Sequence, residues 1–159
     1  MARNINWDIA LFMFSIFIVV QRLQTAGVTN LLASALLIAS KLPSMLRIFA
    51  QSMIVTVGAS FMNNWPRAIL GLLSIQHTGA TGTVLTGLIF SNIIGNNLGP
   101  HFFPLGSLAI LVWLETMRRR GVNVSLREYL KVDAPLSIAQ VAIASAVLWG
   151  ELIVGFHFL

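Results

Sequence analysis

The sequence predicts an all-α membrane protein, and three observations lead to this fold class. Of the 159 residues, 57% are hydrophobic and 9% are charged, with a mean hydropathy of +0.84, whereas soluble domains carry roughly 25% charged residues. The run from Ala68 to Leu114 contains no Lys, Arg, Asp or Glu. Further apolar runs lie on either side of it, and the last of them, residues 134–156, has the length of a membrane span. We therefore expect a single transmembrane domain over residues 1–159.

The first two apolar runs predict one spanning helix followed by one shorter helix. Residues 7–23 begin at Trp7, a residue type that favours the membrane interface. They are short for the roughly 20 residues that a span needs, so the flanking polar residues must help. Residues 28–40 are rich in small side chains, too short to span alone, and end before Pro43. An interfacial or re-entrant helix is expected over residues 28–40.

Residues 45–76 predict a re-entrant hairpin. Two apolar arms, 48–61 and 66–75, flank the polar sequence Asn63-Asn64-Trp65-Pro66. Each arm is marginal for crossing a membrane, and a proline is tolerated at the first position of a helix. The alternative interpretation is one long kinked helix.

Residues 83–117 predict a broken transmembrane helix. The charge-free run contains Ser91-Asn92-Ile93-Ile94-Gly95-Asn96-Asn97-Leu98-Gly99-Pro100, which is rich in amides and helix breakers. Unpaired polar groups cost several kcal/mol in hydrocarbon, so such breaks persist only beside protein or a water-filled cavity. Discontinuous helices of this kind form binding sites in secondary transporters. We expect the break over residues 91–100, with the helix resuming near Pro104.

The last apolar segment, residues 134–156, predicts an ordinary spanning helix. It follows a loop, residues 118–131, that holds half of the ten Lys and Arg residues. Cytoplasmic loops carry an excess of basic residues. We therefore expect loop 118–131 in the cytoplasm and the C-terminus outside, and nucleic-acid binding is not expected despite the net charge of +5.

Candidate solute-binding residues come from the two polar interruptions. Amides offer donors and acceptors that suit a hydroxyl-bearing solute or a partly dehydrated cation. Serines add hydroxyls, and glycines shape the break. The alternative role of these residues is to cap helices and satisfy a broken backbone. The candidates are Ser60, Asn63, Asn64, Ser91, Asn92, Gly95, Asn96, Asn97, Gly99 and Ser107.

His101 follows the second interruption directly and is a candidate proton-linked group, because histidine titrates near neutral pH. The three histidines are too scattered for a metal site, and the chain has no cysteine. It shows no nucleophile–base pair, metal-ligand spacing or phosphate-binding loop. We therefore expect no cofactor and no enzymatic activity.

The interruption 91–100, followed by Pro104-Leu105-Gly106-Ser107-Leu108-Ala109, closely resembles the arsenical pump membrane proteins, arsenite permeases of the ion transporter superfamily. Residues 60–66 resemble the hairpin-tip signature of that family, and the resemblance extends to nearly the whole chain. It covers the C-terminal half of the family pattern. Asn97 stands where family members often carry an aspartate, and His101 where a lysine is common.

The resemblance implies one inverted-repeat half of the ion transporter fold in the plasma (inner) membrane. It implies efflux of arsenite or antimonite by a half-sized permease or the C-terminal portion of one, coupled to protons or sodium. The expected partners are the missing N-terminal repeat or a second copy of the chain, and a soluble arsenite-stimulated ATPase. Two alternatives stay open: a sodium/proton antiporter or carboxylate carrier of the same superfamily, and a non-transporting membrane subunit or gene remnant.

Overall fold

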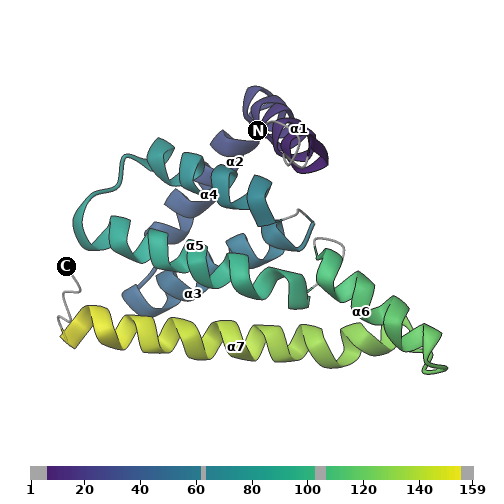
Figure 1. Ribbon diagram of the computed structural model, residues 1–159. Coiled ribbons are helices and arrows are strands. Elements are labelled where there is room, and N and C mark those ends of the chain that lie inside the picture. Colours follow the sequence, from purple (N-terminus) through teal and green to yellow (C-terminus); the bar gives the residue numbers. More distant parts are fainter. Residues whose placement is uncertain (1–6, 62–63, 103–106, 155–159) are drawn as a thin grey trace.

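A computed structural model describes residues 7–61, 64–102 and 107–154, and within these ranges every regular element is a helix. Figure 1 shows the arrangement of the helices, coloured along the chain. Their bounds are α1 (Trp7–Thr25), α2 (Val28–Ser40), α3 (Ser44–Ser60), α4 (Asn64–Thr78), α5 (Gly82–Phe102), α6 (Leu108–Arg119) and α7 (Leu126–Val154). The all-α prediction is confirmed for the part of the chain that the structure describes.

Helix α5 lies at the centre of the packing. It has its most extensive contact with α3 and also packs against α7 and α4, while α2 packs mainly against α4. In Figure 1 the long α7 runs beneath α3 and α5, and α1 lies at the opposite side of the molecule. The main buried cluster joins α2, α3, α4 and α5 through Leu36, Val55, Ile75 and Leu88, and α7 packs on the other side of α3 and α5.

Two sharp turns between helices are made by glycines in the left-handed conformation. Gly27 separates α1 from α2 with φ at +83°, and Gly121 separates α6 from α7 with φ at +81°. Glycine adopts positive φ without the steric cost that a Cβ imposes. At Gly27 the chain bends by 67° between residues 17–25 and 28–40.

Helix α7 begins at Leu126, earlier than the expected start at residue 134. Its first turn carries a capping box, because the Ser125 hydroxyl accepts from the Glu128 backbone N–H at 3.2 Å. The Glu128 carboxylate in turn accepts from the Ser125 N–H at 2.9 Å. Among the described residues α7 is the one helix long and apolar enough to span a membrane, and the bent α1–α2 pair is a second if it counts as one span.

The break expected within residues 91–100 is wrong, because α5 continues without interruption to Phe102. Pro100 lies in the last turn, where only the bond to the Asn96 carbonyl is lost. Two other carbonyls near this end of the helix accept hydrogen bonds from hydroxyl groups: Leu98 O from Ser137 at 3.0 Å and Gly99 O from Ser60 at 3.1 Å. The described chain resumes as α6 at Leu108; Pro104, where the second half was expected to start, lies outside the described residues.

The segment 45–76 forms two helices, α3 and α4, on either side of Phe61 and the undescribed residues 62–63. The two helices touch each other little: α3 packs on α5 and α7, whereas α4 packs on α2 and α5. In the part that the structure describes, α3 and α4 are therefore splayed apart, and α5 lies against both.

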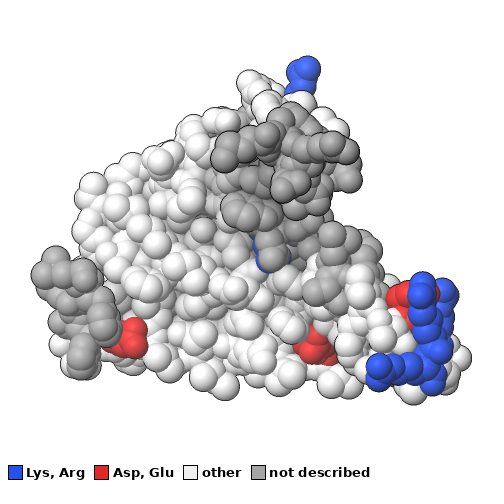
Figure 2. Space-filling model, in the orientation of Figure 1, with Lys and Arg blue, Asp and Glu red and all other residues white. Residues whose placement is uncertain are grey.

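Half of the ten Lys and Arg residues gather at one end of the molecule (Figure 2). Figure 2 shows Lys and Arg concentrated where α6 meets α7, while most of the visible face is uncharged. Glu115 pairs there with Arg118 at 2.8 Å and with Arg119 at 3.1 Å. Surface pairs of this type contribute little to stability. The basic residues that the sequence places in loop 118–131 therefore lie together at one end of the fold (Figure 2).

Candidate solute-binding cavity

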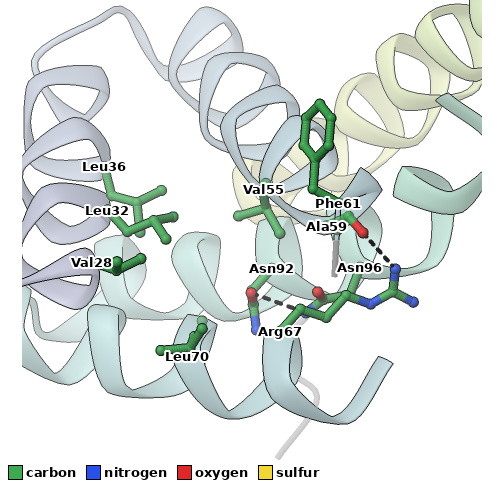
Figure 3. A pocket seen from close by; sticks show the side chains of 12 residues that line it. Val28, Leu32, Leu36, Val55, Ala59, Phe61, Arg67, Leu70, Asn92 and Asn96 are labelled. Carbon is green, nitrogen blue, oxygen red and sulfur yellow. Dashed lines mark hydrogen bonds between the residues drawn. The ribbon is translucent and has the colours of Figure 1, made fainter. Parts of the chain in front are cut away.

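A cavity of about 240 Å³ lies between α2, α3, α4 and α5 (Figure 3). Nine of its twelve described lining residues are apolar or glycine, and three are polar: Arg67, Asn92 and Asn96. Ligand sites are typically apolar concavities with a few placed polar groups. The complete lining consists of Val28, Leu32, Leu36, Val55, Gly58, Ala59, Phe61, Arg67, Leu70, Gly71, Asn92 and Asn96.

One face of α5 positions the cavity by packing tightly against α3. Ser91, Gly95 and Gly99 recur every fourth residue and therefore lie on one face of the helix. A Cβ at Gly95 would lie 2.5 Å from the Val55 Cβ, and one at Gly99 would lie 2.5 Å from the Ala59 Cβ. Small residues that allow such close approach are typical of helix contacts in membranes. These glycines fix the distance between α3 and α5.

The neighbouring face of α5 carries two of the predicted amides into the cavity. Asn92 is 5% exposed, and its Oδ1 accepts from Asn96 Nδ2 at 3.1 Å. Gly71 of α4 leaves the space that the Asn92 side chain occupies, because a Cβ at Gly71 would overlap Asn92 Oδ1. The Asn96 Oδ1 atom is buried and has no hydrogen-bond donor among the described residues. The cavity wall therefore contains a buried acceptor that no donor of the described residues satisfies.

The third polar residue of the cavity is Arg67, which sequence reasoning missed. Its side chain is 7% exposed, and Nη1 donates to the Ala59 carbonyl at 3.1 Å, at the C-terminal end of α3. Figure 3 shows the side chain extending past Asn96 toward Ala59. An ionisable residue within a membrane segment is a functional candidate by default. Its place in the sequence could have indicated this role, because Arg67 directly precedes the charge-free run and follows the predicted hairpin tip.

The predicted hydroxyl groups are used inside the helix packing. Ser60 donates to Thr56 O at 2.8 Å and Gly99 O at 3.1 Å, and Ser91 donates to Ile48 O at 3.4 Å. Ser107 caps α6 by accepting from the Ile110 N–H at 3.4 Å. None of these serines is among the described lining residues. Their contacts match the alternative role of satisfying backbone groups.

The remaining predicted amides do not join the described cavity. Asn97 is exposed and donates from Nδ2 to Ile93 O at 2.8 Å. Asn63 lies outside the described residues, and Asn64 begins α4 with its side chain outside the described part. Of the five asparagines expected to face one cavity, the structure brings together Asn92 and Asn96.

His101 lies at the end of α5, away from the cavity lining. Its Nδ1 is 3.3 Å from Asp133 Oδ2 of α7, and its side chain is half exposed. Asp133 is a second residue that sequence reasoning missed as a partner. Within the described ranges no three His, Cys, Asp or Glu residues are grouped as a metal site would need.

An all-helical fold with close glycine packing, and with one helix long and apolar enough to cross a membrane among the described residues, is typical of a helical membrane protein. The family of arsenical pump membrane proteins matches residues 1–152, and the chain belongs to this family. The sequence-based assignment is therefore confirmed. The family's description as a pump agrees with the expectation that the chain is not an enzyme.

Individual relatives carry the same description. The arsenical pump membrane proteins of Escherichia coli and Yersinia enterocolitica are each 30% identical over 146 residues, which is 92% of this chain and 34% of theirs. A putative arsenical pump membrane protein of Bacillus subtilis is 25% identical over 137 residues, 83% of this chain and 30% of its own. The chain thus spans about a third of the length of these relatives. No solved structure matches it.

Proposed function

We propose that this chain forms part of the transport path of an arsenite or antimonite efflux permease in the plasma (inner) membrane. The main support for this proposal is the cavity, in which Arg67, Asn92 and Asn96 lie among apolar side chains. Family membership supports the substrate class, since the relatives are described as arsenical pumps. The chain acts as a half-sized permease or the C-terminal portion of one.

The cavity chemistry suits arsenite. Trivalent arsenic hydroxide presents hydroxyls that both donate and accept, and an asparagine amide does the same. The unpaired Asn96 Oδ1 offers an acceptor, and Arg67 supplies donors only. The apolar remainder of the lining lowers the local dielectric constant, which strengthens these polar interactions. The site thus complements a small, hydroxyl-bearing solute.

The architecture follows the inverted-repeat scheme of secondary transporters. In this proposal α3 and α4 form a re-entrant hairpin, and α5 with α6 forms a broken span whose interruption falls after Phe102. Since transporter sites lie between repeats, a further repeat or a second copy completes the path. The solute path between this chain and the second repeat or copy is lined, in this proposal, by Asn63, Asn64, Asn97 and Ser107. We also propose that transport is coupled to protons or sodium, with His101 as a proton-linked group. A soluble ATPase docks on loop 118–131.

The proposed orientation is tested by single-cysteine labelling, which needs no background removal because the chain has no cysteine. Cysteine at position 123 is expected to react from the cytoplasmic side only, because the surrounding loop is basic. Cysteines replacing Lys41 and His77 are expected to label from the same side if α3 and α4 form a hairpin. Labelling of position 123 from outside intact cells contradicts the orientation, and opposite sidedness of 41 and 77 contradicts the hairpin.

The transport function is tested with Asn96→Leu in cells that lack their own arsenite efflux and express the chain together with the complementary repeat. Loss of the amide removes both its hydrogen bond to Asn92 and its buried acceptor, so arsenite resistance is expected to fall to the level of the empty vector. Asn30→Leu is the matched control, because Asn30 is an exposed amide of α2 outside the cavity lining. Full resistance with Asn96→Leu contradicts the proposal. Sodium export without arsenite export by the wild type favours the antiporter alternative.

A further inference from the structure

We propose that Arg67 sets the charge selectivity of the cavity, so that it admits neutral or anionic oxygen-bearing solutes and excludes monovalent cations such as Na⁺. This inference rests on the proposed function, whose binding site it refines. It assigns a specificity-determining role to a residue that neither the sequence motifs nor the family description singles out.

The first argument is the charge of the lining. Arg67 is the one ionisable side chain among the twelve described lining residues, and no carboxylate is among them. Arginine stays protonated under all ordinary conditions. In a buried site the effective dielectric constant is well below that of water, so repulsion between a fixed positive charge and an entering cation is several times stronger. A sodium ion at this cavity would also need several oxygen ligands, and the guanidinium would compete with the ion for those oxygens.

The second argument is the position of the guanidinium. The hydrogen bond from Nη1 to Ala59 O anchors one edge of the planar group to the C-terminal end of α3. The guanidinium has five N–H donors in a fixed fork, a geometry that matches the oxygens of an oxyanion or hydroxide. Figure 3 places this side chain beside Asn96, whose buried Oδ1 is an acceptor. Donors and an acceptor thus meet at one end of the cavity.

A purely structural role for Arg67 makes different predictions. If the side chain only holds the end of α3 through Ala59, its replacement lowers stability without changing which solutes bind. Arg67→Gln keeps an N–H donor but removes the charge, whereas Arg67→Lys keeps the charge but loses the planar fork. Comparing the two variants separates charge from hydrogen bonding.

The test is ligand-induced stabilisation of the chain purified in detergent together with the complementary repeat, measured as the thermal unfolding midpoint. A ligand that binds the folded state raises the midpoint with concentration. Sodium arsenite is titrated against sodium chloride at equal ionic strength. The absence of cysteine removes the thiolate ligands that soft elements prefer. We expect a saturable rise for the wild type, at least a tenfold weaker apparent affinity for Arg67→Gln, and an intermediate value for Arg67→Lys.

The matched control is Arg47→Gln, which removes a cation of α3 that lies outside the cavity lining and is expected to bind like the wild type. Equal arsenite affinity in Arg67→Gln and wild type overturns the inference, as does the absence of any arsenite effect on the wild type. A second measurement needs no variant: replacing Na⁺ with N-methylglucamine at constant arsenite is expected to leave the midpoint unchanged. Competition by Na⁺ overturns the inference even if Arg67→Gln fails to fold.

The two proposals fail in different ways. Arsenite-dependent stabilisation that requires Arg67, without arsenite resistance in cells, contradicts the transport proposal alone. Arsenite resistance that depends on Asn96, with binding indifferent to Arg67, contradicts the selectivity proposal alone.

Discussion

On its α3 side, helix α5 presents Ser91, Gly95 and Gly99 to a neighbour in direct backbone contact, whereas on its α4 side it presents Asn92 and Asn96 to a cavity. The α3 side is filled: a Cβ at Gly99 would lie 2.8 Å from the Thr56 carbonyl oxygen. The α4 side leaves about 240 Å³ open and carries an acceptor without a donor. One helix therefore combines a rigid contact with a polar opening.

Within residues 91–99 of α5, the position on the helix decides whether a residue packs against α3 or faces the cavity. Residues four apart share a face, and a shift of one residue turns the side chain by about 100°. The glycines hold α3 and α5 together, so the amides one position further along are held at a fixed place. The same composition that suggests a broken helix thus produces a close-packed one with a polar flank.

The largest expected effect is that of adding a methyl group on the packed side. Gly99→Ala is expected to destabilise the protein by about 1–3 kcal/mol, because the new Cβ meets Ala59 and the Thr56 backbone, which cannot rotate away. The measurement is the thermal unfolding midpoint in detergent. Gly150→Ala in α7 is the control, since nothing lies within 4 Å of the position of its new Cβ. An unchanged midpoint for Gly99→Ala would mean that the contact between α3 and α5 is looser than described.

A smaller effect on stability is expected from the same change on the cavity side. In Gly71→Ala the new Cβ meets the end of the Asn92 side chain, which can rotate. The expected loss is below about 1.5 kcal/mol, comparable to that of one hydrogen bond, whereas arsenite resistance falls because Asn92 and Asn96 lose their arrangement. Destabilisation as large as that of Gly99→Ala, or full resistance, would remove the distinction between the two sides.

Much of the fold is predictable from apolar runs. The bounds of α2 follow from a short apolar stretch between Gly27 and Lys41, and the existence of α7 follows from the apolar residues after Ala134. The early start of α7 also had a signal in the Ser-x-x-Glu pattern at Ser125, which was not used. The continuity of α5 was not predictable, because the contact that favours Gly95 and Gly99 in a helix comes from α3, a segment distant in sequence.

The candidate site was predictable in part. Asn92 and Asn96 stand out as amides in an apolar run, and their spacing of four places them on one face. Asn97 has the same composition signal but faces away, and only the orientation of the helix separates it from Asn96. Arg67 was not predictable as a lining residue, because it lies outside the charge-free run and only the folding of α4 against α3 and α5 brings it to the cavity. The partner of His101, Asp133, lies in α7 just before residue 134, where the helix was expected to begin.

The length of α7 has a consequence for how deep the molecule sits in a bilayer. Its 29 residues, at about 1.5 Å each, extend for roughly 44 Å, whereas the hydrocarbon layer is about 30 Å thick. If α7 crosses the bilayer upright, about nine of its residues extend beyond the acyl chains. The charged residues Arg127, Glu128, Lys131 and Asp133 occupy the first eight positions of the helix. We therefore expect this end of α7 to place the basic residues at the level of the lipid headgroups, where anionic lipids attract them.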